Sequence, residues 1–389
     1  MVFTRSLTPV LIERAQRYPV VTLTGPRQAG KTTVCRQAFA HLPYANLERP
    51  DTREFALADP SGFLAQFEHG AVLDEIQRVP ALLSWIQARV DEHPGPGQFI
   101  LTGSHNFDLM SGRMSDIRQS LAGRTALLQL LPMSVNELLT AGLRLPVEQL
   151  LFAGGYPRIH ADALDPVVTL ADYFATYVER DLRQLVELKN LDEFRRFVKL
   201  AAGRVGQLLN LHSLAADVGV SDHTAQAWIS LLEASYVVRL VRPWFANLGK
   251  RLIKAPKLYF CDVGLAAWLI GITDVAQLAT HPLRGSLFEN LVVMEFVKHA
   301  LNQGLAPALH FYRDSAGLEV DLLVEYGVSP GQVGLVEIKA GRTFHGDWLQ
   351  PMERLAGILG PQVARRMVVY GGTESYVRAG VQVVGLGAA

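Results

Sequence analysis

The chain has 389 residues, with 37 lysines and arginines balanced by 37 aspartates and glutamates, so its formal net charge is zero. At about 100–200 residues per domain, this length predicts two or three domains. Hydrophobic residues make up 49% and charged residues 19%, which excludes a disordered chain. The balanced charge excludes a uniformly basic nucleic-acid coat protein, although a local basic patch remains compatible with it.

The two cysteines, Cys35 and Cys261, are too far apart in sequence to indicate a disulfide framework or a zinc site. The first residues include Arg, Glu and Pro without a long apolar run, which argues against a signal peptide. No uncharged stretch of about 18 apolar residues occurs, so we expect no membrane-spanning helix. These features predict a cytoplasmic protein without a membrane partner.

The first part of the chain alternates strand and helix patterns. Short apolar strands are expected at residues 20–24, 71–73, 99–102 and 126–131, with helical patterns between most of them. Strands separated by helices are typical of a parallel α/β sheet. The chain is therefore predicted to be an α/β multidomain protein whose first domain covers residues 1–134.

A glycine-rich turn follows the first strand. Its sequence, GPRQAGKT, satisfies the pattern G-x-x-x-x-G-K-[ST] and stands between a predicted strand and a predicted helix. In such a turn the backbone N–H groups surround phosphate oxygens, the lysine reaches the β- and γ-phosphates, and the hydroxyl binds Mg²⁺. The pattern predicts an ATP and Mg²⁺ site in which Lys31 is catalytic. Its residues are Gly25, Pro26, Arg27, Gln28, Ala29, Gly30, Lys31, Thr32 and Thr33.

Acidic and polar side chains follow the next two strands. Asp74 ends the strand at 71–73 and would join Thr32 in holding Mg²⁺, while Glu75 would polarise the attacking water. Ser104 or Asn106, after the third strand, would contact the γ-phosphate or that water. A loop after a strand with no such role is the alternative interpretation of these last two residues.

An arginine follows the glycine of the segment SLAGR. Arg124 would act as an arginine finger toward the nucleotide of a neighbouring subunit, where its charge stabilises the transition state. Arg113 and Arg118 compete with it for this role.

The segments GPRQAGKTT, LDEIQ, LTGSH and SLAGR together resemble the AAA-type ATPases of bacteria and archaea. More narrowly, nearly the whole chain resembles a family that joins this ATPase to a carboxy-terminal domain of unknown function. The segments GGYP at 154–157 and YVERDL at 177–182 match the middle region of that family. The resemblance implies ATP binding and hydrolysis, and a homo-oligomer such as a hexameric ring.

The middle of the chain is helical from 135 to 204, and residues 205–245 then show helix, glycine turn, helix and strand. This order is the outline of a winged helix-turn-helix. A basic stretch with interleaved aromatics follows, and it contains Arg239, Arg242, Lys250, Arg251, Lys254 and Lys257. Such residues suit phosphate contacts with DNA. A winged helix that packs between domains is the alternative.

The last third of the chain shows helix, three strands, helix and strand, with acids at defined places. Asp321 lies on one expected strand, and Glu337 and Lys339 lie on one face of the next. A hairpin between the strands would bring the two carboxylates and the lysine together. This D…E-x-K arrangement resembles the restriction-endonuclease-like nucleases, in which an acid on the first helix, here Glu289, completes the site.

The nuclease resemblance implies a second Mg²⁺ held by the carboxylates and the Ile338 carbonyl, with Lys339 stabilising the transition state. Two alternatives stay open for this cluster. The acids and the lysine are ordinary surface charges on a hairpin, or the domain has the nuclease fold and serves only to bind DNA or partners.

We expect five segments: the ATPase domain at 1–134, a helical lid or connector at 135–204, a winged helix at 205–245, a linker region at 246–284 and a restriction-endonuclease-like domain at 285–389. The predicted function is an ATP-hydrolysing AAA-type enzyme that remodels, translocates or processes DNA, branched DNA included. A regulatory NTPase switch, in which the winged helix and an inactive nuclease-like domain mediate protein assembly, is the alternative. A toxin–antitoxin or defence role has no support beyond the nuclease resemblance.

Overall fold

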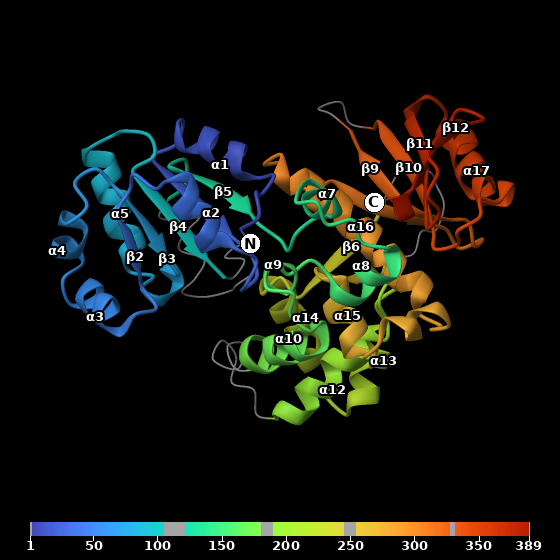
Figure 1. The fold of residues 1–389 in the computed structure, drawn as a ribbon, viewed down its shortest axis with the longest axis horizontal. Coiled ribbons are helices and arrows are strands. Elements are labelled where there is room, and N and C mark those ends of the chain that lie inside the picture. Colours follow the sequence, from blue (N-terminus) through green and yellow to red (C-terminus); the bar gives the residue numbers. More distant parts are fainter. Residues whose placement is uncertain (1, 105–120, 180–189, 245–253, 327–330, 389) are drawn as a thin grey trace.

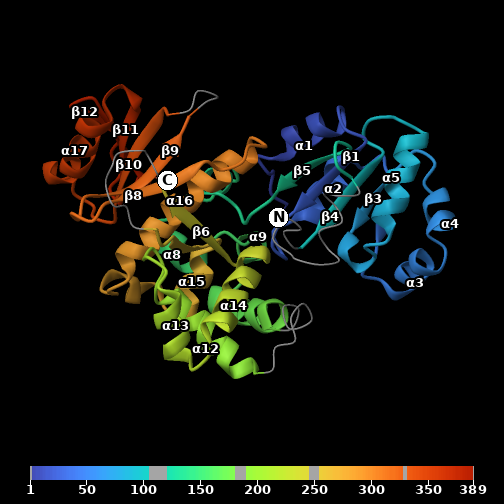
Figure 2. The same cartoon turned by 180° about the vertical axis from the view of Figure 1, so that it is seen from behind.

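A computed structural model of the chain describes residues 2–104, 121–179, 190–244, 254–326 and 331–388. Two β-sheets lie at opposite ends of the molecule, and a group of helices lies between and below them (Figure 1). The view from behind shows the same separation of the two sheets (Figure 2). The chain is thus a mixed α/β protein with two sheets.

The first sheet has five parallel strands in the order β2-β3-β4-β1-β5. Its strands are β1 (Val20–Thr24), β2 (Tyr44–Asn46), β3 (Ala71–Asp74), β4 (Phe99–Gly103) and β5 (Thr125–Gln129). Every residue of β1, β3 and β4 is buried, because apolar clusters cover both faces of the sheet. The four predicted strands are therefore present, and β2 is an edge strand that the sequence pattern did not indicate.

Helices surround the first sheet, as expected of a strand–helix alternation. They are α1 (Thr8–Ala15), α2 (Lys31–Ala38), α3 (Pro50–Ala58), α4 (Pro60–Ala65), the short η1 (Ile76–Arg78) and α5 (Leu82–Glu92). Figure 1 shows this unit in blue and cyan.

The helical middle of the chain begins with a capping box, in which Ser134 and Glu137 satisfy each other's backbone N–H groups at the start of α7. Its elements are α7 (Val135–Thr140), α8 (Val147–Ala153), α9 (Pro157–Ala161), α10 (Pro166–Tyr173), the π-helical η2 (Phe174–Glu179), α12 (Leu191–Ala202), α13 (Leu211–Val218) and α14 (Asp222–Ala234). A turn through Gly219, whose φ is +88°, separates α13 from α14. These helices share one apolar core with α15 (Val263–Leu269) and α16 (Arg284–Asn302).

The second sheet has eight strands in the order β12-β13-β11-β10-β9-β8-β6-β7 and mixes parallel and antiparallel pairs. Its strands are β6 (Val238–Pro243), β7 (Lys257–Phe260), β8 (Leu309–Arg313), β9 (Glu319–Glu325), β10 (Val333–Lys339), β11 (Val363–Tyr370), β12 (Tyr376–Arg378) and β13 (Val381–Gly385). The long helix α16 (Arg284–Asn302) precedes β8, and α17 (Gln350–Leu359) lies between β10 and β11; short helical turns are η4 (Gly346–Leu349), η5 (Gly360–Gln362) and η6 (Leu386–Ala388). Strands β8, β9 and β10 run antiparallel, and β11 pairs parallel with β10.

The expectation of a linker at 246–284 is wrong for the part that the structure describes. This stretch contains β7, the helix α15 (Val263–Leu269) and the turn η3 (Val275–Ala279). All four residues of β7 are buried, and so are most residues of α15. Because β7 pairs with β6, which also pairs with β8, this part of the chain extends the second sheet.

Among the described residues, no helix combines the length and the apolar character that crossing a bilayer requires.

Candidate nucleotide site

The glycine-rich turn joins β1 to α2 at the carboxyl edge of the parallel sheet. Gly25 has a φ of +151°, and a Cβ placed on it would lie 2.0 Å from the carbonyl oxygen of Leu130. Gly30 has a φ of +92° and stands at the N-cap of α2. Only glycine fits the first position without a shift of the backbone, and the second adopts a conformation that favours glycine. The turn therefore presents the amino end of α2 to a bound anion.

Lys31 is buried in this turn. Its ammonium group donates to the carbonyl oxygens of Gly25 and Pro26, each at 2.9 Å. Burial lowers the pKa of Lys31, and Glu75 and Asp74 oppose that shift. The ammonium is thus held by main-chain oxygens that a nucleotide phosphate can replace.

Asp74, at the end of β3, accepts hydrogen bonds from three hydroxyl groups. Thr32 Oγ1 donates to it at 2.9 Å, Tyr44 OH at 2.7 Å, and Thr102 Oγ1 also donates to it. A threonine hydroxyl beside an aspartate at a phosphate-binding turn supplies the oxygen ligands that a nucleotide-bound Mg²⁺ would take. The two predicted magnesium ligands, Thr32 and Asp74, are brought together.

Glu75 follows Asp74 and has a left-handed conformation, with a φ of +59°. Its backbone N–H donates to Thr102 Oγ1 at 3.1 Å. The amide nitrogen of Gln77 donates both to the Glu75 carboxylate and to Ser104 Oγ, the latter at 2.9 Å. The amide of Gln77 therefore joins the predicted water-activating acid to the predicted sensor, a role the sequence did not reveal. Asn106, the other sensor candidate, lies outside the described residues.

A cavity of about 940 Å³ opens over the turn and has walls from two parts of the chain. The first part supplies Arg27, Lys31, Thr32, Glu48 and Glu75 among others. The helical middle supplies Pro157 and Arg158 from the start of α9, and Thr176 and Tyr177 from η2. Pro157 of GGYP and Tyr177 of YVERDL thus reach the nucleotide cavity, and Arg158, which follows GGYP directly, is a lining cation that the sequence analysis missed.

Two tyrosines connect the carboxyl edge of the first sheet to the end of α14. The Tyr177 hydroxyl lies 3.1 Å from the carbonyl oxygen of Ser104 and 3.0 Å from that of Ser235. The Tyr236 hydroxyl shares a hydrogen bond of 2.7 Å with Thr24 Oγ1 at the end of β1. Arg27 of the glycine-rich turn also lies over the Tyr177 ring, 6.0 Å from its centroid.

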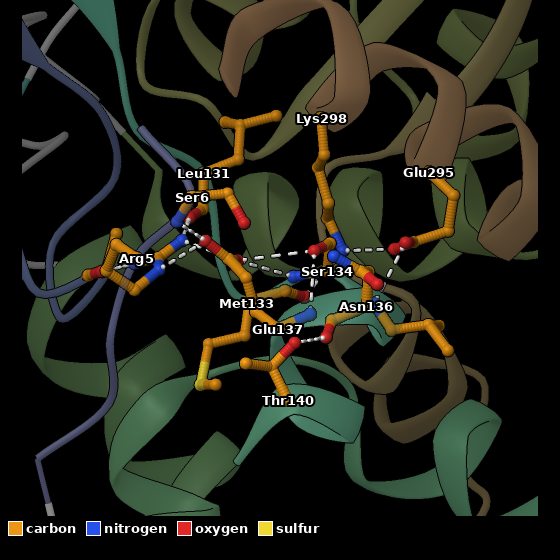
Figure 3. A network of polar contacts seen from close by, with 12 residues as sticks. Arg5, Ser6, Leu131, Met133, Ser134, Asn136, Glu137, Thr140, Glu295 and Lys298 are labelled. Carbon is orange, nitrogen blue, oxygen red and sulfur yellow. Dashed lines mark hydrogen bonds and ion pairs between the residues drawn. The ribbon is translucent and has the colours of Figure 1, made fainter. Parts of the chain in front are cut away.

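A buried polar network supports the turn from behind. Arg5 donates to the carbonyl oxygen of Ala29 at 2.6 Å and to Glu137 at 3.1 Å. Figure 3 shows how this network continues through residues 133–135 to the side chains of Lys298 and Glu295 on α16, where Lys298 donates to Met133 O at 2.9 Å and Glu295 accepts from Val135 N at 2.9 Å. The phosphate turn is therefore linked by hydrogen bonds to α16.

Arg124 lies at the amino end of β5, where the sheet register pairs its neighbour Thr125 with Val20 at the start of β1. The glycine-rich turn follows the opposite end of β1, so Arg124 is remote from its own chain's phosphate site. Its guanidinium pairs with Asp91 at 2.6 and 2.8 Å. A finger role toward a neighbouring subunit stays a prediction, and the competing Arg113 and Arg118 lie outside the described residues.

The C-terminal acids also converge. Val336 on β10 pairs with Leu322 on β9, which places Asp321 beside Glu337. Asp321 accepts from the Ile338 N–H at 2.8 Å and from Lys339 Nζ at 3.4 Å, and Lys339 Nζ lies 2.5 Å from Glu337. The sequence-predicted trio is therefore assembled on the second sheet.

Glu289 on α16 joins this cluster through residues of β7. Lys257 Nζ lies 3.0 Å from Glu289 and 2.8 Å from Glu319, and the Tyr259 hydroxyl donates to Glu289 at 2.6 Å. Lys257 was expected on a phosphate-binding surface, but its side chain is only 4% exposed. That expectation is wrong because β7 turns the side chain toward the acids.

Burial and charge shift the protonation of this cluster. Burial, and then the Asp321 carboxylate, raise the pKa of Glu337 to about 8. Burial lowers the pKa of Lys257, but Glu289, Asp321 and Glu319 outweigh it and raise the pKa above its ordinary value. Glu337 Oε2 is buried and has no hydrogen-bond partner. In the described part of the chain, no group of three acidic, histidine or cysteine residues has the arrangement of a metal site.

Comparison with known proteins identifies relatives along most of the chain. The chain is 34% identical over 364 residues to Uncharacterized protein Rv2008c of Mycobacterium tuberculosis and, equally, to Uncharacterized protein Mb2031c of Mycobacterium bovis. The match covers 92% of this chain and 78% of each relative. The chain belongs to the family of these mycobacterial proteins.

Three family models match successive parts of this family member. Residues 17–139 match an AAA domain, residues 145–276 match the domain of unknown function DUF8612, and residues 284–388 match the domain of unknown function DUF4143. The AAA match contains the glycine-rich turn and Asp74, so the first sheet belongs to an AAA-type P-loop ATPase domain. The description of the third family model names no activity for residues 284–388.

Solved structures with some similarity include the Walker-type ATPase PABY2304 of Pyrococcus abyssi, which is 14% identical, has a TM-score of 0.44, and matches over 69% of this chain and 96% of that one. The AMPPCP-bound DnaA of Aquifex aeolicus is also 14% identical, with a TM-score of 0.30 over 58% of this chain and 85% of DnaA.

Proposed function

We propose that this AAA-type ATPase acts on nucleic acid, and that ATP turnover changes the position of the segment around α14, which contacts DNA. The observation that carries the proposal is the placement of Tyr177. Its ring lies near Arg27 of the phosphate turn, and its hydroxyl lies between the carbonyl oxygens of Ser104 and Ser235. Tyr177 therefore connects the nucleotide cavity to the end of α14, so a change of contacts at the γ-phosphate would be transmitted through this side chain.

The catalytic roles follow from the contacts in the nucleotide cavity. Thr32 and Asp74 would hold Mg²⁺, which would supply positive charge to offset the negative charge that develops on the phosphates. Lys31 would exchange its two carbonyl partners for β- and γ-phosphate oxygens. Glu75 would orient the attacking water, and the Gln77 amide would keep Glu75 and Ser104 at a fixed separation.

The winged helix of this proposal covers residues 205–245, which contain α13, α14 and β6. The pairing of β6 with β7 and the bridge between Leu208 and Lys257 support it, because they supply the strands that follow the two helices in such a module. In such a module the second helix of the turn presents its outer face to DNA. The exposed residues of α14 are Asp222, His223, Gln226, Ala227 and Ser230. Arg242 and Lys254, which are exposed, would contact phosphates beside this face.

The C-terminal domain would bind DNA in the same complex. Its order of α16, three antiparallel strands, α17 and a strand parallel to β10 supports the restriction-endonuclease-like resemblance. A homo-oligomer, with Arg124 directed at the next subunit, belongs to the same proposal.

The test is steady-state ATP hydrolysis with and without single-stranded, duplex and branched DNA. We expect at least one DNA form to stimulate hydrolysis, and Arg242→Glu to weaken that stimulation several-fold. Arg17→Glu, a reversal at an exposed arginine that follows the end of α1, is the matched control and should retain it. If none of the three DNA forms changes the rate, the proposal fails.

One observation favours a second function, a nucleotide-regulated assembly switch. The exposed face of α14 carries Asp222 and no lysine or arginine, which suits a protein partner better than a phosphate backbone. This function predicts that ATP and ADP give different oligomeric masses by light scattering while DNA leaves hydrolysis unchanged.

A further inference from the structure

The acidic cluster of the second sheet also contains a lysine. The acids belong to the C-terminal domain, whereas the lysine comes from a strand that precedes this domain. Lys257 belongs to β7, whereas Glu289, Glu319, Asp321 and Glu337 belong to α16, β9 and β10. Its ammonium group bonds to Glu289 at 3.0 Å and to Glu319 at 2.8 Å. The Phe311 ring lies 5.5 Å from the same nitrogen and Tyr259 covers Glu289, so the lysine is enclosed.

A second ammonium group fills the other half of the cluster. Lys339 Nζ lies 2.5 Å from Glu337 and 3.4 Å from Asp321, between the two carboxylates that the nuclease resemblance assigns to a metal. Arg313 also pairs with Glu319 at 3.3 Å. Four acidic side chains therefore face three cationic side chains. A divalent cation needs an excess of negative oxygen ligands, and this balance removes most of that excess.

We infer that this lysine-filled cluster is a structural contact that holds β7 against the C-terminal domain, and that the Lys257 ammonium group takes the place of a divalent metal ion. The acids and Tyr259 together hold α16, β7 and β9 in one unit. On this account the domain binds its ligand without metal-dependent cleavage. The inference does not depend on whether the ATPase acts on DNA.

One feature of the cluster opposes the inference. Glu337 Oε2 is buried without a partner and is the kind of oxygen that a metal ion would recruit. The tests therefore distinguish two states of the cluster. In one, Asp321 and Glu337 hold a metal ion; in the other, Lys257 and Lys339 neutralise the acids and no metal ion binds.

The first test measures Mn²⁺ binding by the full chain without nucleotide. The electron paramagnetic resonance signal of free Mn²⁺ reports how much of the ion remains unbound. Wild type and Asp321→Asn should give the same binding curve, because Asp321 is already paired. Asp347→Asn, an exposed aspartate of η4, is the matched control for loss of one charge. A saturable Mn²⁺ site in wild type that Asp321→Asn removes and Asp347→Asn retains would overturn the inference.

The second test removes the lysine. Lys257→Met removes the ammonium group between Glu289 and Glu319 and should create a Mn²⁺ site there at least about 10-fold tighter than any in wild type, which the added Glu289→Gln change abolishes. A folded Lys257→Met chain, judged by circular dichroism, that gains no Mn²⁺ site would show that the lysine does not stand in for a metal. Should Lys257→Met fail to fold, the comparison of wild type with Asp321→Asn decides alone.

Discussion

The nucleotide site and the lysine-filled cluster both combine carboxylates with a buried lysine, but they pair them differently. In the nucleotide site, Lys31 donates to main-chain carbonyl oxygens, and Asp74 accepts from the hydroxyl groups of Thr32, Tyr44 and Thr102. In the cluster, the ammonium groups of Lys257 and Lys339 contact the carboxylates directly. Neutral partners leave a site able to take Mg²⁺ and phosphate, whereas an ion pair satisfies the charges in advance. The same residue types therefore do not imply the same chemistry.

The largest expected effect comes from the lysine of the cluster. Lys257→Met leaves the Glu289 carboxylate without its cationic partner, and loss of one partner of a buried pair costs about 3–5 kcal/mol. Urea unfolding followed by tryptophan fluorescence should show this loss. Lys254→Met, a change at an exposed lysine three residues away, should stay within about 0.5 kcal/mol of wild type. Equal stabilities of the two variants would mean that Lys257 does not hold β7 against the C-terminal domain.

The lysine of the nucleotide site should affect turnover rather than folding. Lys31→Ala removes a preorganised cation from the phosphates and should lower kcat for ATP about 10²- to 10³-fold. Lys339→Ala, the corresponding change in the cluster, should leave kcat within about 2-fold. A comparable loss of ATP turnover in both variants would contradict the separation of the two sites.

The pH dependence of stability should distinguish the two sites through Glu337. Its folded pKa of about 8 exceeds its ordinary value of 4.5, so the folded state binds the extra proton. That contribution is fully present below about pH 4.5 and is lost as the pH rises through 8. In EDTA, Glu337→Gln should therefore gain on the order of 2 kcal/mol relative to wild type between pH 5 and pH 9.

Urea unfolding at the two pH values measures the Glu337→Gln difference. Glu353→Gln, an exposed position on α17, is the control and should give a difference that does not change with pH. If the effect of Glu337→Gln on stability does not change with pH, Glu337 does not carry the extra proton in the folded state.

The smallest effect is expected at the edge of the nucleotide cavity. Arg158 lines the cavity from α9 and also pairs with Asp162 at 3.5 Å, with its side chain 66% exposed. Arg158→Ala should raise KM for ATP a few-fold, about 0.5–1 kcal/mol, because an exposed cation is screened by solvent. Arg144→Ala, at an exposed site that does not line the cavity, should leave KM unchanged, and identical KM values for both variants would exclude a role for Arg158.

The sequence patterns predicted most of the elements that form from residues close together in the chain. β1 occupies the expected residues 20–24, and β3 ends at Asp74, because buried parallel strands read as short apolar runs. The two-residue periodicity of β10 placed Glu337 and Lys339 on one face, and the hairpin register brought Asp321 to them. The residues of the glycine-rich turn and their proposed roles rest on the same local spacing.

The partners that the sequence analysis missed come from distant segments. Tyr44 lies on an edge strand of three residues, too short for a recognisable pattern. Lys257 was expected in a basic stretch that suits phosphate contacts, and only the pairing of β7 with β6 shows that its side chain points inward. Tyr177 begins the segment YVERDL and Arg158 directly follows GGYP, but no sequence spacing indicates that both reach the nucleotide cavity.

The most direct measurement of the difference between the two sites is the Mn²⁺ content of the full chain with a non-hydrolysable ATP analogue. The account predicts one tightly bound ion per chain, lost in Asp74→Asn and retained in Asp321→Asn. Two ions per chain, with the second lost in Asp321→Asn, would contradict it.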